Sequence, residues 1–206
     1  MTVDAAPVPR ASAVRASVVL GDDGVARCGW AANDAEYRRY HDEEWGRPVH
    51  DEQRLFEKLC LEGFQAGLSW ITILRRRPAF RSAFAGFDAG AMAAFTDADV
   101  ERLLGDERII RHRGKITAAI DNARTTLALG ESLAELIWSF APTPRPAALR
   151  DLAEVPAITL ESTALSKALR SRGYKFVGPT TMYALMQSSG LVNDHVAGCH
   201  LAPPPA

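Results

Sequence analysis

KLCLEGFQAGLSWITILRRR, residues 58 to 77, is the segment in which two helix-forming runs meet, at Gly67. Ser69 stands where its side chain can cap the second helix. Glu62 is the one acid in this largely apolar segment, and such a carboxylate must be paired, exposed at a kink, or line a pocket. The join brings Glu62, Leu68 and Trp70 to one corner. The segment therefore predicts a helical corner that is also a candidate site.

Helical patterns continue on both sides of this corner. The clearest is an apolar stripe at i, i+3, i+4 and i+7 that begins at Ile116 and ends before Gly130. Pro78 is expected to end the second helix of the corner. The expected helices cover residues 33–45, 51–67, 69–77, 79–86, 88–95, 97–104, 114–130, 132–140, 161–172 and 180–189. No pair of segments alternates as paired strands do, so the predicted fold class is all-α.

The two ends of the chain lack such patterns. Residues 1–25 are predicted to be a disordered leader and residues 202–206 a disordered tail, which leaves residues 26–201 as a single domain. No tract approaches the roughly 18 apolar residues of a membrane span, and the first residues lack the apolar run of a signal peptide. Three cysteines are too few and too odd in number for a disulfide framework. These observations predict a cytoplasmic protein with no membrane partner.

Basic residues gather in three runs, although the net charge of -1 makes no global case for nucleic acid. The runs lie at residues 75–77, 108–115 and 167–175, and such runs are usually solvated helix faces. The last run leads into RGYKFVGPT, whose glycines can expose backbone N–H groups to a phosphate. A tight turn between helices explains the same glycines. Both interpretations stay open on the pattern alone.

Cysteine and histidine residues stand near both ends of the predicted domain. Cys28 and His41 lie at its start, and His195 and Cys199 at its end, where they share one face if the segment is helical. Two thiols and two imidazoles form a tetrahedral zinc set with no open position, so the metal would be structural. The alternative is a pair of ordinary buried thiols with unrelated histidines, and His200 is an adjacent competitor as ligand.

Aromatic residues surround the corner segment in the predicted helices. They are Trp30, Tyr40, Trp45 and Trp70. Aromatic residues at helical spacing usually belong to a core. Glu62 changes that balance, because a buried carboxylate between aromatic faces suits a flat, cationic ring with N–H donors. A methylated purine is such a ring.

Six ordered motifs in this chain resemble the bacterial 3-methyladenine DNA glycosylase I family. They are CGW at 28–30, YHDEEWG at 40–46, LEGFQAGLSWITIL at 61–74, IIRHRGKI at 109–116, SKALRSRGYKFVGPT at 166–180 and LVNDHVAGC at 191–199. The likeness covers roughly residues 26–201. It implies the fold of the helix-hairpin-helix DNA glycosylases, which is all-α and two-lobed with the active site in the cleft between the lobes.

The resemblance also implies roles for individual residues. A structural zinc ion is expected to join the chain ends through Cys28, His41, His195 and Cys199. The extruded base is expected to be held by Glu62 as the catalytic residue and by Tyr40, Trp70 and Trp30. Contacts to DNA are expected from Leu68, a candidate wedge in the duplex, and from Gly173, Lys175, Gly178 and Thr180 of the hairpin.

The chain departs from the wider superfamily at Asn193, where many helix-hairpin-helix glycosylases carry a catalytic aspartate before a histidine. Asp194 is left as a partner of a metal ligand or as a helix cap. The change is tolerable because N3-methylation makes the adenine cationic, so the base leaves as a neutral molecule. Phe64 replaces a polar residue of some relatives and is expected to alter the pocket.

The implied function is base excision repair by a monomer. The enzyme would flip 3-methyladenine out of double-stranded DNA and release it by hydrolysis, without cleaving the strand. The alternative from another class is a zinc-stabilised module that binds damaged DNA without turnover. Such a module would need no carboxylate in its pocket, so Glu62 favours the enzyme.

Overall fold

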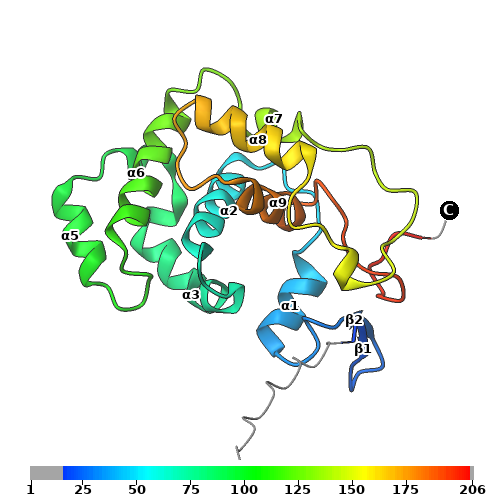
Figure 1. Ribbon diagram of the computed structural model, residues 1–206. Helices are drawn as coiled ribbons and strands as arrows, with labels where there is room; N and C mark the ends of the chain where they lie inside the picture. Colours follow the sequence, from blue (N-terminus) through cyan, green and yellow to red (C-terminus); the bar gives the residue numbers. More distant parts are fainter. Residues whose placement is uncertain (1–15, 205–206) are drawn as a thin grey trace, which may run out of the picture.

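The computed structural model describes residues 16–204 and is mostly helical (Figure 1). Its strands are β1 (Val18–Leu20) and β2 (Ala26–Cys28). Its α-helices are α1 (Ala35–Glu43), α2 (Glu52–Gln65), α3 (Trp70–Ala83), α4 (Ala89–Ala93), α5 (Asp97–Gly105), α6 (Arg113–Leu127), α7 (Leu133–Trp138), α8 (Leu160–Ser171) and α9 (Pro179–Ser188). Two short 3-10 turns, η1 (Ala85–Phe87) and η2 (Leu152–Glu154), complete it. In the part of the chain described, none of the helices has the length and hydropathy to cross a membrane.

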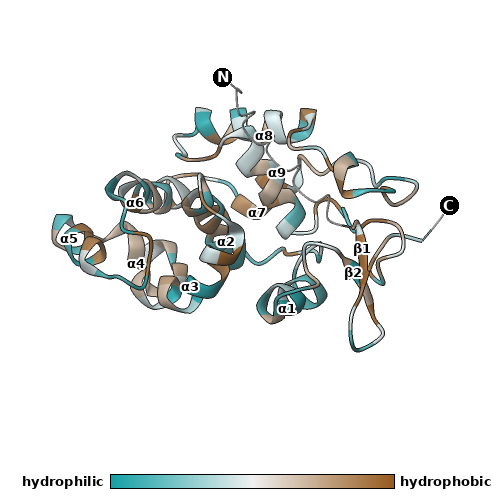
Figure 2. Ribbon diagram, turned by 60° about the horizontal axis from the view of Figure 1, so that its bottom comes forward, coloured by the Kyte–Doolittle hydropathy of each residue, from teal (hydrophilic) through white to brown (hydrophobic). Residues whose placement is uncertain are grey.

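Helix α2 lies at the centre of the helices and contacts α3, α6, α7 and α9 (Figure 1). Its residues from Leu55 to Phe64 are all buried, although three of them carry charge. Helices α3 to α6 lie on one side of α2, and α8 and α9 lie on the other with α1 and the strands beyond them (Figure 1). One cluster of buried apolar side chains runs through both groups of helices, so the two groups share a core. Figure 2 shows hydrophobic and hydrophilic positions side by side along α5, as expected where only one face is buried.

The corner predicted at Gly67 is present between α2 and α3. Gly67 adopts a φ of 81°, which favours glycine, and Ser69 is the N-cap residue of α3. The Ser69 hydroxyl bonds to Thr72 Oγ1 at 2.8 Å instead of capping a backbone N–H. Lys115 of α6 stabilises the corner, because its Nζ donates to the carbonyls of Phe64 at 2.8 Å and Ala66 at 2.5 Å. A buried cation therefore satisfies the carbonyl end of α2.

The prediction that Pro78 ends the second helix is wrong. Helix α3 runs through Pro78 to Ala83 and absorbs most of the helix that was predicted at residues 79–86. The proline removes one backbone N–H, but Ile73 before it and Phe80 after it are completely buried. Packing of this face against the core outweighs the lost hydrogen bond.

The fold is mostly helical, as predicted, but the prediction that it contains no sheet is wrong, and part of the predicted leader forms a strand. Strands β1 and β2 form an antiparallel hairpin in which Val18 pairs with Cys28. Each strand has three residues, too few for an alternating pattern to be recognised. The hairpin is held by tertiary contacts, since Val18 packs on a small buried cluster with Val196 and Cys199. The rest of the predicted leader, residues 1–15, lies outside the described residues.

The predicted disordered tail is wrong for residues 202–204, which the structure describes. Ala202 packs against the same buried cluster, and its N–H bonds to the Cys199 carbonyl at 3.0 Å. Pro203 and Pro204 line a surface cavity together with Leu191. The prediction of disorder came from composition, because prolines cannot donate backbone hydrogen bonds.

Replacing Lys115 with Met should destabilise the fold by about 2–3 kcal/mol, because it removes two charge-assisted hydrogen bonds from the buried end of α2. The free energy of unfolding in urea, measured by circular dichroism, tests this. The matched control is Lys167→Met at an exposed position of α8, which should unfold like the wild type. Equal stability of both variants would contradict the capping role.

Candidate active site

A cavity of about 460 Å³ opens between α1, α2, α3, α9 and the η2 turn. Aromatic side chains dominate its walls, namely Trp30, Tyr37, Tyr40, Trp45 and Trp70. Glu62 is the acid in this lining. Helix α1 presents two of the aromatic rings, because Asp34 caps the helix by accepting from the N–H groups of Glu36 and Tyr37. The Tyr37 hydroxyl in turn accepts from the Ile71 N–H at 3.0 Å, which joins α1 to the first turn of α3.

Glu62 lies in the buried face of α2 with only 3% of its surface exposed. Burial raises the pKa of its carboxyl group to about 7, while the charge of Lys58 opposes that rise. Its Oε2 atom has no hydrogen-bond partner among the described residues, and neither has the buried Nε1 of Trp70. An acceptor and a donor that are both buried and unpaired are costly unless a ligand completes them. The cavity is therefore suited to a ring that carries hydrogen-bonding groups.

The aromatic rings predicted to hold a base form adjoining walls. Tyr40 and Trp70 have ring centroids 5.5 Å apart at an angle of 49°. A flat ring sandwiched between two aromatic faces would need a separation of about 7 Å, twice a van der Waals contact. The two rings thus contact each other, and a base would stack on one outward face. Trp30 is edge-on to both Tyr37 and Trp45, with centroids 5.5 and 5.1 Å apart, and closes a further side.

The predicted DNA-contacting residues lie near the C-terminal end of α2, the end that also carries Glu62. Leu68, at the corner, is 40% exposed, and Phe176 of the loop between α8 and α9 is 41% exposed. The loop is held close to the corner, because a Cβ added at Gly63 would lie 3.3 Å from Phe176. Asn122 of α6 fixes the loop backbone by accepting from the Lys175 N–H at 2.8 Å and donating to the Lys175 carbonyl at 3.0 Å.

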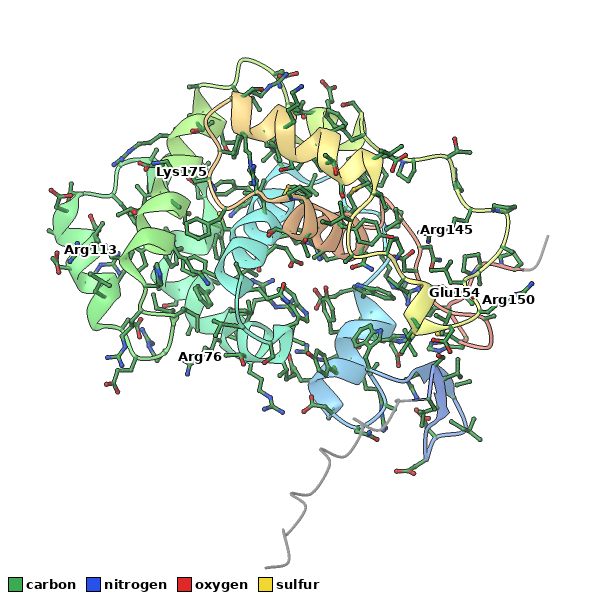
Figure 3. The ribbon with its side chains drawn as sticks, in the orientation of Figure 1. Arg76, Arg113, Arg145, Arg150, Glu154 and Lys175 are labelled. Carbon is green, nitrogen blue, oxygen red and sulfur yellow. The ribbon has the colours of Figure 1, made fainter. Side chains whose placement is uncertain are left out.

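Individual loop residues differ in what they contribute. Gly173 adopts a φ of 98° and requires glycine, whereas Gly178 is the N-cap of α9 in an extended conformation. Thr180, in the first turn of α9, is exposed. Lys175 is also exposed, and its Nζ forms an ion pair with Asp121 at 2.6 Å. Figure 3 shows Lys175 beside α6, on the opposite side of the molecule from Arg150 and Glu154.

Three of the predicted zinc ligands come together in the folded chain. The ligand atoms of Cys28, His41 and Cys199 all lie within 4.8 Å of one another, and His41 Nε2 is 3.4 Å from Cys199 Sγ. His195 adjoins this group without falling within that mutual distance, its ring edge-to-face with His41 at a centroid distance of 4.8 Å. The segment from residue 191 to 201 contains no helix, so the condition under which His195 and Cys199 would share a helix face is not met. His200, the competing ligand, is exposed with its Nδ1 2.9 Å from the Ala26 carbonyl.

The donor set suits a metal with nitrogen and sulfur ligands. The Nδ1 atoms of both histidines are engaged, at 2.8 Å from Asp42 Oδ1 for His41 and 2.8 Å from Asn193 Oδ1 for His195. Both rings can therefore direct Nε2 to a metal. The Nε2 of His195 is buried and has no partner in the described chain. Burial and the neighbouring His41 lower the pKa of His195 to about 4, which keeps this imidazole neutral.

The role predicted for Asp194, as partner of a metal ligand, is filled by Asn193. Its Oδ1 atom bonds to the backbone N–H and Nδ1 of His195 and so orients that ring. Asp194 is completely buried and bonded by Arg145, by the Tyr183 hydroxyl at 2.6 Å and by Gln187 Nε2 at 2.8 Å. Gln187 lines the cavity, so this network orients a side chain of the cavity wall.

Several wall residues were missed in the sequence. Tyr37 precedes Tyr40 by three residues on the same helix, and that spacing could have found it. Leu152 and Val155 come from the η2 turn in the Pro-rich excursion, and nothing in their pattern distinguishes them from a surface loop. Phe64, predicted to alter the pocket, instead faces the core, where its ring lies 4.7 Å from that of Phe80.

The family model for methyladenine glycosylase matches residues 30–202 of this chain. The chain belongs to the methyladenine glycosylase family. It is 52% identical over 177 residues to DNA-3-methyladenine glycosylase 1 of Escherichia coli (strain K12), a match that covers 84% of this chain and 95% of the relative. It is 48% identical over 177 residues to DNA-3-methyladenine glycosylase of Haemophilus influenzae, covering 84% and 96% of the two chains.

Solved structures of methyladenine glycosylases share this fold. A crystal structure of 3-methyladenine DNA glycosylase I has a TM-score of 0.83 and 51% identity, and 86% of this chain covers all of that one. The Staphylococcus aureus enzyme, studied for its recognition of 3-methyladenine, has a TM-score of 0.81 and 32% identity, covering 87% of this chain and 98% of that one. The family match begins at Trp30, so the β1–β2 hairpin lies outside it.

Replacing Glu62 with Gln should stabilise this methyladenine glycosylase at pH 8. The folded protein holds the proton of Glu62 up to a pKa of about 7, whereas the unfolded chain releases it near 4.5. Between these values the folded protein binds the extra proton, so its stability falls as the pH rises through this window and is lowest above 7. Glu62→Gln removes this cost of ionising the buried carboxyl group, which is worth about 3 kcal/mol.

Chemical unfolding of wild type and Glu62→Gln at pH 4.5 and pH 8 measures the effect. The gain in stability should appear at pH 8 and be small at pH 4.5. The matched control is Glu57→Gln on the same helix, whose carboxylate is paired with Arg81 at 2.8 Å. That variant should not gain stability as the pH rises. A Glu62→Gln protein no more stable than wild type at pH 8 would contradict the cost of burying Glu62.

Proposed function

We propose that this protein is a DNA repair glycosylase that excises 3-methyladenine from alkylated DNA by hydrolysing the N-glycosyl bond. The observation that carries the proposal is Glu62, a buried carboxylate with an unpaired oxygen in an aromatic cavity. The family and its close relatives, which are DNA-3-methyladenine glycosylases, support the same reaction. A fold neighbour with a TM-score of 0.81 and 32% identity holds 3-methyladenine itself.

The cavity supplies what a cationic base requires. In DNA, N3-methylation places a positive charge on the adenine, and aromatic faces attract such a charge. The Glu62 carboxylate accepts the N–H donors of the base and opposes its charge, while Tyr40 and Trp70 provide adjoining stacking surfaces. Trp30 completes the enclosure. Binding in this environment fixes the base outside the stack and favours the bond cleavage that releases it as a neutral molecule.

Water attack on the sugar needs little help from the protein. Asn193 cannot act as a base, and its carbonyl oxygen is occupied by the backbone N–H and Nδ1 of His195. A positively charged base is already a good leaving group, so orientation and desolvation supply the main contribution. The Lys58 amine donates to the Ser188 carbonyl and does not line the cavity, so it is not placed to attack the sugar. We therefore propose a monofunctional enzyme that does not cleave the strand.

We propose that double-stranded DNA binds near the C-terminal end of α2, at Leu68 and at the loop between α8 and α9. Leu68 is exposed at the corner and can enter the gap left by the flipped nucleotide. The loop with Gly173, Lys175, Gly178 and Thr180 offers backbone N–H groups, a cation and a hydroxyl to phosphates. A cytoplasmic, monomeric enzyme stays a prediction from the sequence.

We propose further that Cys28, His41, His195 and Cys199 hold one structural zinc ion. Its chemistry is that of a four-ligand N₂S₂ site, which leaves no coordination position for substrate. The unpaired Nε2 of His195 and the engaged Nδ1 atoms of both histidines support this assignment. The metal would join β2 and α1 to the last turns of the chain.

Glu62→Gln should reduce the release of 3-methyladenine from methylated DNA by about 100-fold or more, because the amide removes a charge that acts on the cationic base. Single-turnover release of free base, measured by chromatography, tests this, with Glu57→Gln as the matched control that keeps wild-type activity. Wild-type excision by Glu62→Gln would overturn the role of Glu62.

Binding of the DNA without any release by the wild type would favour the non-catalytic alternative. Strand cleavage with a borohydride-trapped adduct would contradict the monofunctional mechanism.

Purified protein should contain one zinc ion per chain, and Cys199→Ser should lose it together with several degrees of thermal stability. Metal content by mass spectrometry and thermal unfolding measure the two effects. Cys60→Ser is the matched control, since Cys60 is equally buried but lies in the main core. Full zinc content in the Cys199→Ser protein would exclude Cys199 as a ligand.

A further inference from the structure

Lys58 is a buried cation that the proposed mechanism does not use. It lies on α2 four residues before Glu62, with only 8% of its surface exposed. Its Nζ donates to the Ser188 carbonyl near the end of α9 at 2.8 Å and lies 6.0 Å from the centroid of the Tyr40 ring. This bond keeps the ammonium group behind the cavity wall. A buried lysine is costly unless opposite charge lies near it.

Two acids favour the charged form of Lys58, namely Glu44 and Glu62, and the nearby Glu57 is paired with Arg81. From α1 and α3, Glu44 and Arg77 form a two-bond ion pair with N–O distances of 2.5 and 2.6 Å, so each neutralises the other. Tyr40 of α1 is uncharged at neutral pH, since burial raises its pKa well above the usual value. Arg54 on α2 is exposed to solvent. Helix α9 presents the Ser188 carbonyl to the lysine.

We infer that Lys58 is a positioning residue that favours the ionised form of Glu62 inside the cavity and so makes the cavity an acceptor for the N–H edge of the base. The inference rests on the proposed function of Glu62. Neighbouring positions i and i+4 lie on the same face of a helix, which places the cation one turn behind the carboxylate. Because Lys58 is held by Ser188, it acts on Glu62 through space and leaves Oε2 free for the ligand.

The protonation state of Glu62 decides what the cavity can bind. An ionised carboxylate only accepts hydrogen bonds, whereas a protonated one offers a donor to the N–H groups of the base. Burial raises the pKa of Glu62 to about 7, and the charge of Lys58 acts against that rise. Burial also lowers the pKa of Lys58 to about 8, so the lysine is still mainly charged at neutral pH. Without this cation the pKa of Glu62 would be higher still, and less of the carboxyl group would be ionised at neutral pH.

Two substitutions separate the charge of Lys58 from its hydrogen bond. Lys58→Gln keeps an N–H donor without the charge, and Lys58→Arg keeps the charge. Single-turnover release of 3-methyladenine is measured from pH 5.5 to pH 9 with both. In Lys58→Gln the acid-side midpoint should move up by about one pH unit, so release falls several-fold at pH 6.5 and returns to within about twofold of wild type at pH 9. Lys58→Arg should keep the wild-type midpoint, as should the exposed control Lys167→Gln.

A second measurement needs no variant at Lys58. The carboxyl ¹³C resonance of Glu62, assigned by its disappearance in Glu62→Gln, is followed by NMR in the wild-type protein. It should show its own titration and a second, smaller inflection as Lys58 loses its proton. A single inflection, an unchanged midpoint in Lys58→Gln, or a loss of release that is equal at every pH would overturn the inference. Failure of the wild type to release 3-methyladenine would overturn the proposed function instead, and the NMR titration would still test the coupling.

Discussion

Burial of charge inside helix α2 is the constraint on which the rest of the structure depends. A helix buried along ten consecutive residues must pair every charged group and every terminal carbonyl that it takes out of water. Glu57 pairs with Arg81 of α3, Lys58 bonds to the Ser188 carbonyl of α9, and Lys115 of α6 satisfies the last carbonyls. Each pairing ties α2 to a different helix. Among these groups, Glu62 keeps an oxygen without a hydrogen-bond partner, and Glu62 is the one that lines the cavity.

The cavity around Glu62 depends on a second set of contacts that joins the two ends of the chain. Cys28 of the hairpin, His41 of α1 and Cys199 of the final turns meet in one buried cluster. The η2 turn, which contributes Leu152 to the cavity wall, is bonded to the same region. The Ala197 N–H bonds to the Leu149 carbonyl at 2.7 Å, and the Ser17 hydroxyl accepts from the Leu152 N–H at 3.1 Å. The hairpin that precedes the family match therefore supports a wall residue of the cavity.

Helix positions were predictable because their causes are local. The apolar stripe of α6 and the corner at Gly67 both act within a few residues. The β1–β2 hairpin and the passage of α3 through Pro78 were not predictable, because packing with distant residues decides both. In the site, Glu62 was visible as an acid among apolar residues. Leu152 and Val155 were not, since they become wall residues only through the path of a long loop.

A cavity with a single carboxylate and no second base sets a limit on what the enzyme can excise. An unmodified adenine in DNA is uncharged, and its N-glycosyl bond breaks readily only if the base is protonated. Glu62 is the acid in the cavity lining, and in the ionised form that the proposed mechanism uses it has no proton to give. Asn193 cannot supply a proton relay either, because its side chain is held by His195. Normal bases that enter the cavity thus lack the activation they would need, whereas a base that is already cationic brings its own. Selectivity then arises from the chemistry of the lesion as much as from the shape of the walls.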